Sequence, residues 1–141
     1  MKEPKYLLSR PNVTARALVE YKKKFLLLYA PWCKKWTLPG GRVECTDTLE
    51  QTISRELTEE IGIKPKKIKF VGFGQGAQYG ESIKCAPPKL HMIFYTPINK
   101  KPVVNKKESE KTKWVTLEEM KKLKDKEDGI DDFFRRFPNA L

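Results

Sequence analysis

Apolar residues recur at alternate positions or in short runs along most of the chain, and this pattern predicts a sheet. Short segments rich in valine, leucine, isoleucine and phenylalanine are typical of strands. Lysine-rich turns and stretches with glycine or proline separate them. The expected strands cover residues 12–20, 25–29, 36–38, 68–73, 90–96 and 113–115, and the first two are expected to form a hairpin.

One stretch, residues 48–62, has a helical period instead of alternation. It opens on Thr48 and Gln51, which have the spacing of a capping box, and closes on Gly62, a common C-terminal stop. Its apolar positions recur at a spacing of four and therefore form one stripe on a helix. These positions are Leu49, Ile53, Leu57 and Ile61.

Two shorter helices are expected at 117–123, capped by Thr116, and at 130–137. Strands and helices are thus interspersed, and the expected fold class is α+β, a mixed α/β sandwich. A chain of 141 residues with no repeat, low-complexity tract or long linker indicates one domain over residues 1–141.

Lysine dominates the charged residues and makes the chain basic. There are 29 basic and 18 acidic residues, for a net charge of +11, and 23 of the basic residues are lysines. A lysine-rich surface favours polyanions without naming one. Two interpretations stay open: a solvated surface, or a partner such as nucleic acid or another phosphorylated molecule.

Neither a membrane protein nor a secreted one is expected. No apolar run approaches the ~20 residues that span a bilayer, and no signal-peptide stretch follows Met1. The three cysteines, Cys33, Cys45 and Cys85, are too few and scattered for a zinc site, and an odd number cannot fully pair within the chain. Free thiols in a reducing cytoplasm are the expectation.

Three carboxylates share one face of the expected helix 48–62. Glu56, Glu59 and Glu60 stand at i, i+3 and i+4, which are neighbouring positions on a helix. Like charges at this spacing repel one another, and near a helix C-terminus they also oppose the dipole. A cation that prefers oxygen ligands, Mg²⁺ or Mn²⁺, would compensate. The alternative is a solvated acidic face.

The residues around these glutamates carry a known signature. Residues 41–63 contain G-x5-D-x7-R-E-L-T-E-E-I-G-I, which resembles the Nudix box, G-x5-E-x7-R-E-U-x-E-E-x-G-U, with U aliphatic. The one departure at a fixed position is Asp47. The segments 36–41 and 114–119 also resemble Nudix proteins, so the likeness to this family of MutT-like nucleotide pyrophosphohydrolases extends over residues 12–125.

The resemblance implies a Nudix α/β/α sandwich with a mixed central sheet. It implies divalent-metal-dependent hydrolysis of a nucleoside diphosphate linked to another moiety, by attack of water on a phosphorus. Glu56, Glu59 and Glu60 would bind Mg²⁺ or Mn²⁺, and the carbonyl of Gly40 would add an oxygen. Arg55 would form an ion pair that orients a box glutamate.

The resemblance also implies a fourth carboxylate, from a later loop, acting as ligand or base. Glu108 and Glu110 precede Trp114 in the appropriate region, and Glu108 is preferred. Ordinary loop acids are the alternative. Asp47 is one methylene shorter than the family glutamate, so we expect weakened or altered outer metal binding rather than inactivity. Its charge would also suit a helix N-terminus.

Substrate choice in this family depends on residues outside the box. Trp32 and Tyr79, in expected loops, are the preferred base-stacking residues, and the place of Tyr79 after the box favours a dinucleoside polyphosphate over ADP-ribose. Arg16, Lys34 and Arg42 are candidates for contacts with phosphates, with surface solvation as the alternative. Further residues weighed were Tyr29, Phe73 and Phe94 for stacking, Lys35 for phosphate, and His91 as a structural histidine.

A small-molecule nucleotide is therefore the expected substrate, and a nucleoside triphosphate is the first choice. The alternatives are a dinucleoside polyphosphate, the 5′ end of RNA, and a nucleotide-sensing domain without catalysis. Nucleic acid as a partner is not favoured, because no aromatic and basic recognition module is visible. Family members are often dimers, so a homodimer is an open alternative.

Overall fold

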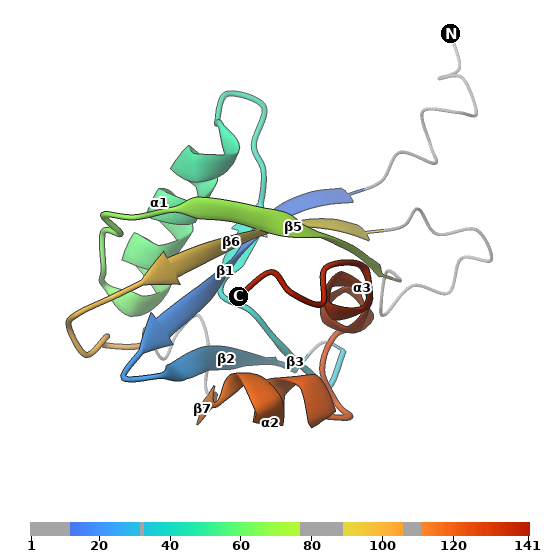
Figure 1. Ribbon diagram of the computed structural model, residues 1–141. Helices are drawn as coiled ribbons and strands as arrows, with labels where there is room; N and C mark the ends of the chain where they lie inside the picture. The colour runs from blue at the N-terminus through green and yellow to red at the C-terminus, as the bar shows by residue number, and fades with distance from the viewer. Residues whose placement is uncertain (1–11, 32, 77–88, 106–110) are drawn as a thin grey trace, which may run out of the picture.

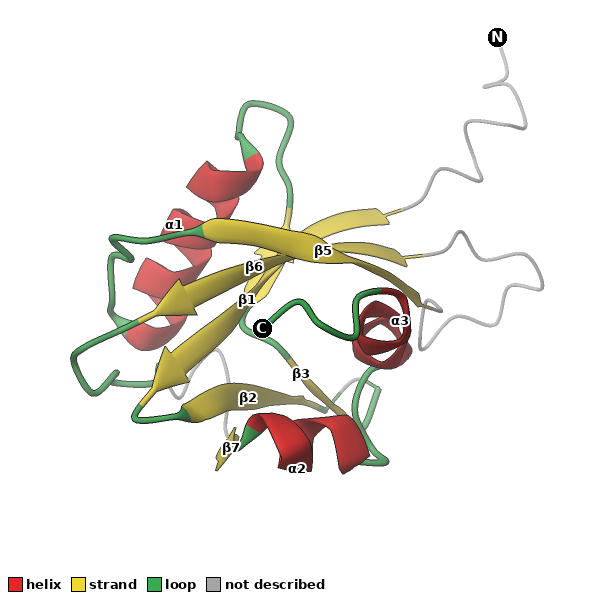
Figure 2. Cartoon of the chain, viewed as in Figure 1, coloured by secondary structure: helices red, strands yellow, loops and turns green. Residues whose placement is uncertain are grey.

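The computed structural model describes residues 12–31, 33–76, 89–105 and 111–141. They form one mixed sheet with helices on both faces (Figure 1), and Figure 2 shows the same elements by type. The strands are β1 (Asn12–Tyr21), β2 (Lys24–Ala30), β3 (Lys35–Thr37), β4 (Gly40–Arg42), β5 (Lys69–Gly76), β6 (Lys89–Pro97) and β7 (Thr112–Val115). The helices are α1 (Leu49–Ile61), α2 (Leu117–Lys122) and α3 (Asp128–Arg136).

Strand β1 organises the sheet. It runs parallel to β6 from Asn12 to Glu20 and antiparallel to β4 from Thr14 to Arg16. The strand order is β3-β2-β1-β6-β5, with β4 beside β1 and β7 beside β2. Because parallel and antiparallel pairs share one sheet, the expected α+β class with a mixed central sheet is confirmed.

Helix α1 covers one face of the sheet. The side chains of Ala15, Ala17 and Val19 alternate toward it along β1, and the two alanines leave room for close approach of the helix. The expected apolar stripe of α1 supplies most of the other side of this core. Its fully buried members are Ile53, Leu57 and Ile61, and they pack with Leu26, Leu28 and Phe94.

Helices α2 and α3 cover the opposite face. Leu18 of β1 points to this side and packs with residues of β2 and β6. Met120 of α2 and Phe133 of α3 close the cluster, and both are fully buried. The sheet therefore separates two cores, which is the expected sandwich of layers.

The expected hairpin of the first two strands is confirmed, whereas β4 was not expected. The hairpin is short, since β1 and β2 pair only through Glu20 with Phe25 and Tyr21 with Lys24, after which β2 pairs with β3 and β7. Residues 39–41 are a proline and two glycines, which is typical of a turn, but Gly40 and Gly41 belong to β4. A Cβ at Gly40 would lie 2.1 Å from the carbonyl oxygen of Ala15, so only glycine permits this pairing with β1.

Element ends shift by a few residues elsewhere. The strand expected to stop at residue 73 continues to Gly76, and the last helix begins at Asp128 rather than at 130. Among the described residues, no helix is long and apolar enough to cross a membrane.

Candidate functional site

Helix α1 carries the acidic residues of the site. Thr48 caps its first turn by accepting from the Gln51 N–H, and the Gln51 side chain accepts from the Thr48 N–H, which is the expected capping box. The helix ends at Gly62, which has the left-handed φ of 68°. With the apolar stripe anchored in the core, Glu56 lies half-buried beside the sheet and Glu59 is exposed.

Glu56 faces the backbone of β4. A Cβ at Gly41 would lie 2.5 Å from the Glu56 carboxyl carbon, so the absence of a side chain there admits the carboxylate. Burial raises the pKa of Glu56, and the negative charge of Glu59 raises it further. Glu59 is therefore close enough to disfavour the charged form of Glu56.

Arg55 connects Glu56 to the loop before the helix. Its Nη1 donates to Glu56 Oε1 at 3.0 Å, and its Nη2 donates to Asp47 Oδ2 at 2.8 Å. The exposed carboxylate of Glu44 lies 3.6 Å from Nη1. The hydrogen bond to Asp47 raises the pKa of Arg55. Asp47 thus reaches the arginine despite its short side chain, while Thr48 takes the capping position.

Glu60 and Arg16 hold the segment that leads into β4. Oε1 of Glu60 accepts from the Gly40 N–H at 2.9 Å. Nη1 of Arg16 donates to the carbonyls of Leu38 and Gly40, at 3.1 and 3.3 Å. Both backbone polar groups of Gly40 are therefore hydrogen-bonded: its N–H to a carboxylate of α1, and its carbonyl to a guanidinium of β1.

The donor set of α1 suits a hard divalent cation. Across the described ranges, no three histidine, cysteine or acidic side chains converge as a finished metal cage, because Glu56 pairs with Arg55 and Glu60 with Gly40. The carboxylates on this face of α1 nonetheless offer only oxygen ligands, and the repulsion that Glu59 exerts on the charge of Glu56 is the condition that a cation relieves. The residues thus fit Mg²⁺ or Mn²⁺.

Several residues proposed from the sequence lie elsewhere or outside the described residues. Lys34 is exposed in the turn before β3 and Arg42 is exposed at the end of β4. Phe94 is 1% exposed and packs edge-on against Phe70, so it cannot stack on a base. Phe73 packs on Phe137, and Tyr29 packs on Trp36. The residues outside the description are Trp32, Tyr79, Cys85, Glu108 and Glu110.

A buried polar cluster under α3 was not expected from the sequence. Thr14 Oγ1 and His91 Nδ1 are 2.6 Å apart, and the hydroxyl of Thr37 donates to Glu127. Burial lowers the pKa of His91 to about 4, although Glu127 lies 3.6 Å away. Glu127 is 1% exposed, yet it stands in a run of charged residues that suggests a surface loop. His91 is thus buried and structural.

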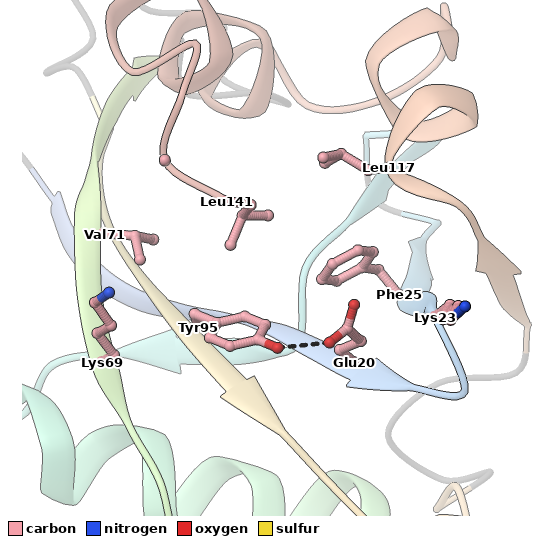
Figure 3. Close-up of a pocket in the computed structure, with 9 residues that line it drawn as sticks. Glu20, Lys23, Phe25, Lys69, Val71, Tyr95, Leu117 and Leu141 are labelled. Atoms are coloured by element: carbon pink, nitrogen blue, oxygen red, sulfur yellow. Dashed lines mark hydrogen bonds between the residues drawn. The ribbon is translucent and has the colours of Figure 1, made fainter.

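A cavity of about 430 Å³ lies on the face of the sheet that α2 and α3 cover (Figure 3). Tyr95 and Glu20 line it, and the Tyr95 hydroxyl donates to Glu20 at 2.5 Å. That hydrogen bond raises the pKa of Tyr95 to about 12. None of the carboxylates of α1 lines this cavity, so it is separate from the acidic site.

Comparison with curated proteins gives relatives whose names describe different activities. The chain is 29% identical over 100 residues to an 8-oxo-dGTP diphosphatase of Buchnera aphidicola, covering 71% of this chain and 65% of that protein. It is 37% identical over 65 residues to an ADP-ribose pyrophosphatase of Methanocaldococcus jannaschii, covering 44% and 38%. The matches thus span less than two thirds of the length of these relatives.

Solved structures and a family model agree on the fold. A crystal structure of the MutT protein from Methanosarcina mazei has a TM-score of 0.77 and 25% identity, covering 93% of this chain and 96% of that one. The family model of the NUDIX domain matches residues 9–137, which is nearly the whole sequence. With the box glutamates on α1 and the layers of the fold in place, this chain belongs to the NUDIX family.

Proposed function

We propose that this protein is a divalent-metal-dependent nucleotide pyrophosphohydrolase, with a nucleoside triphosphate as the first-choice substrate. The observation that carries the proposal is the placement of three glutamates on α1: Glu56 and Glu60 face the glycine backbone of β4, and Glu59 is exposed beside them. The diphosphatase and pyrophosphatase names of the relatives point to the same reaction class.

In this proposal Glu56, Glu59 and Glu60 hold Mg²⁺ or Mn²⁺. When bound, such an ion neutralises phosphate oxygens and lowers the pKa of water. The oxygen of a water forms a new bond to phosphorus while the bridging phosphorus–oxygen bond breaks, and the water's proton passes to a carboxylate base. Glu108, and after it Glu110, is the proposed base or additional ligand.

The remaining residues position these groups. Arg55 holds one oxygen of Glu56 and so limits the directions in which the carboxylate can point. Arg16 and Glu60 fix the Gly40 peptide, whose carbonyl is proposed as a further ligand. Trp32 and Tyr79 are proposed to stack on the base, and Lys34 and Arg42 to meet phosphates, with Arg16 adding positive charge beside them.

The test is a product-release assay over a nucleotide panel with Mg²⁺, Mn²⁺ or EDTA. The panel contains nucleoside triphosphates, oxidised dGTP, ADP-ribose, diadenosine polyphosphates and 5′-triphosphate RNA, with products identified by mass. We expect metal-dependent cleavage of one class. Nucleotide binding without any cleavage, in a folded protein that binds Mn²⁺, would favour the sensing domain instead.

Glu59→Gln tests the assignment of the carboxylates. Because it removes a ligand charge from an exposed position, turnover should fall about a hundredfold or more while the fold is kept. Glu50→Gln, an exposed glutamate in the first turn of the same helix, is the matched control and should retain activity. Full activity in Glu59→Gln would refute the ligand assignment. The proposal includes a cytoplasmic location, and a homodimer is an open alternative that the mass in solution checks.

A further inference from the structure

A second concave site lies at the C-terminal end of α1. It is a cavity of about 460 Å³, and four of the side chains around it are lysines: Lys64, Lys66, Lys67 and Lys100. The first three follow the end of α1, and Lys100 follows β6, so the fold brings together two separate segments (Figure 1). We call it the lysine cavity.

The lysine cavity is the centre of an uncompensated positive charge. Between residues 62 and 102 the sequence contains eight lysines and a single acidic residue, Glu81. In the described part of the chain, none of the four cavity lysines has a carboxylate within ion-pair distance. Four lysines therefore surround one cavity without a carboxylate partner among the described residues.

The helix dipole explains only part of this arrangement. A cation just beyond a helix C-terminus is favourable, but the effect falls off within about one turn. That accounts for a lysine such as Lys64, directly after Gly62. It does not account for Lys100, which belongs to another segment, or for the concave shape that all four lysines share.

The chemistry of the lysine cavity selects a chain of phosphates. Lysine ammonium groups act as point charges toward phosphate, and several of them around one hollow suit several phosphates in sequence. A concave surface admits a single strand more readily than the convex side of a duplex. A lipid surface would need one broad apolar face, whereas the large apolar side chains exposed in the described ranges, Phe70, Val103 and Leu141, come from three separate segments.

We propose that the lysine cavity binds the phosphate backbone of a single-stranded polynucleotide. Lysines that contact phosphates make no contact with base edges. Binding is therefore expected to be insensitive to the base sequence and strongly dependent on salt. This binding does not require the hydrolysis proposed above, and the two can be tested separately.

The cavity adjoins the helix turn that bears the site carboxylates. Glu60 precedes Gly62 by two residues, which is about 3 Å along a helix axis. The segment that follows Lys100 is tied to this turn, since the Val103 N–H donates to the Ile61 carbonyl at 3.1 Å and the Asn105 N–H to the Glu60 carbonyl at 2.7 Å. A strand held in the cavity would therefore run beside the acidic end of α1. If the proposed hydrolysis holds, RNA with a 5′ triphosphate would be a substrate class for that site.

The test uses fluorescence anisotropy with a 20-nucleotide single-stranded RNA that carries a 5′ monophosphate, and the same sequence as DNA, over 50–200 mM salt. The triple variant Lys64→Gln, Lys66→Gln and Lys67→Gln should bind RNA about tenfold more weakly at 100 mM salt. Its slope of log K against log salt should fall by about 2, since each phosphate contact to a single strand contributes about 0.7.

The control variant removes three lysines from the opposite face: Lys121→Gln, Lys122→Gln and Lys124→Gln. It has the same net charge as the first variant and should keep nearly all of the affinity. Equal weakening in both variants would mean that net charge alone acts, and would overturn the proposal, as would the absence of RNA and DNA binding. Loss of binding to phosphatidylserine vesicles, but not to RNA, in the first variant would assign the cavity to membranes.

Turnover of mononucleotides separates this proposal from the proposed function. Both triple variants should hydrolyse them like the parent protein. If no nucleotide is hydrolysed but RNA binding still depends on the lysine cavity, the proposed function fails and the polynucleotide site stands. If the RNA and DNA affinities of the two variants are equal while hydrolysis is intact, the polynucleotide site fails and the proposed function stands.

Discussion

At the scale of single residues, Asp47 acts through Arg55. Its carboxylate accepts from Nε at 3.3 Å and from Nη2 at 2.8 Å, which leaves Nη1 to hold Glu56. Asp47→Asn removes the charge of this partner, so the guanidinium can swing toward the exposed Glu44. A carboxylate displaced by about 1 Å can cost up to a hundredfold in rate, and we expect turnover to fall about tenfold.

The stability of Asp47→Asn should change little, because the Arg55 side chain is 31% exposed and water screens the ion pair. Steady-state rates and thermal unfolding of the same samples check both statements. Asp47→Glu keeps the charge and should retain most of the activity. A loss of rate in Asp47→Glu as large as in Asp47→Asn would show that the ion pair is not what matters.

Gly41 is a second residue whose effect is local. Gly41→Ala places a methyl group 2.5 Å from the Glu56 carboxyl carbon, at the end of a flexible side chain that can move away. The backbone accepts alanine there, so we expect a change of at most a few degrees in the melting temperature and about a tenfold loss of turnover.

Gly62→Ala should show the opposite pattern. Its Cβ would meet only the Val103 carbonyl oxygen, at 3.8 Å, but its φ of 68° strains alanine by about 1 kcal/mol. Stability should therefore fall while turnover stays within about twofold. Similar losses of rate in the two variants would contradict a specific contact between Gly41 and Glu56.

The sequence predicted the arrangement of the glutamates on α1 but not the contacts that other residues make around them. The spacing of Glu56, Glu59 and Glu60 follows from helix geometry alone, and so does their position beside the buried stripe. The contact between Asp47 and Arg55 joins residues eight apart across a helix start, which no periodicity reports. Glu127 could not be recognised as buried, because its neighbours in the sequence are charged and only the tertiary packing of α3 covers it.

At the scale of elements, Asp132 fastens α3 to β5. Its Oδ2 accepts from the Gln75 N–H and from Arg136 Nε, both at 2.7 Å, and its Oδ1 accepts from Arg135 at 2.6 Å. Burial alone would raise the pKa of Asp132, but the Gln75 hydrogen bond and the two arginines outweigh it and lower the pKa to about 2.

This lowered pKa makes the attachment of α3 sensitive to acid. The folded carboxylate binds its proton at lower pH than the unfolded one, whose pKa is about 3.9, so its contribution is complete above pH 4 and is lost as the pH falls toward 2. Asp132→Asn should lower the free energy of unfolding at pH 7 by about 1.5 kcal/mol. It should also reduce the difference in stability between pH 4 and pH 2.

Urea unfolding of both proteins at pH 7, 4 and 2 checks this prediction. Asp125→Asn, an exposed aspartate between α2 and α3, serves as the control and should keep the parent pH dependence. An unchanged acid response in Asp132→Asn would indicate that other carboxylates fasten α3.

Most elements could be predicted from local pattern, but apart from the hairpin of β1 and β2 the pairing of strands could not. The stripe and both caps of α1 are sufficient to place that helix within one residue of each end. The strand β4 has only glycines and an arginine, so no apolar alternation predicts it. It exists because its backbone pairs with that of β1. The expected hairpin shortened because β2 pairs with β3 and β7 over longer stretches.

At the scale of the whole molecule, the parallel pair of β1 and β6 defines the sheet. It joins Thr14 to His91 and Ala17 to Phe94, residues 77 apart in the sequence. The apolar residues of each strand indicate that both strands are buried, yet they contain no information about which strands are neighbours. The mixed sheet therefore followed from the resemblance of residues 41–63 to the box, while the periodicity alone gave only the α+β class.

The last prediction concerns metal binding and global stability. A ligand that binds only the folded state stabilises it by RT ln(1 + [L]/Kd), about 2.7 kcal/mol at a concentration of a hundred times Kd. For a chain of 141 residues this is a rise of roughly 8–10 °C in melting temperature. Because the proposed ligands lie on α1, which packs into the core through Ile53 and Leu57, the ion should stabilise the whole fold rather than one loop.

Differential scanning calorimetry with increasing Mn²⁺, against EDTA at equal ionic strength, measures this rise. Glu59→Gln should shift the midpoint of the Mn²⁺ dependence to at least about tenfold higher concentration, whereas Glu50→Gln should leave it unchanged. Equal Mn²⁺ dependence in the parent and in Glu59→Gln would place the ion on other carboxylates. Since no turnover is needed, the measurement separates a failure of metal binding from the choice of a wrong substrate.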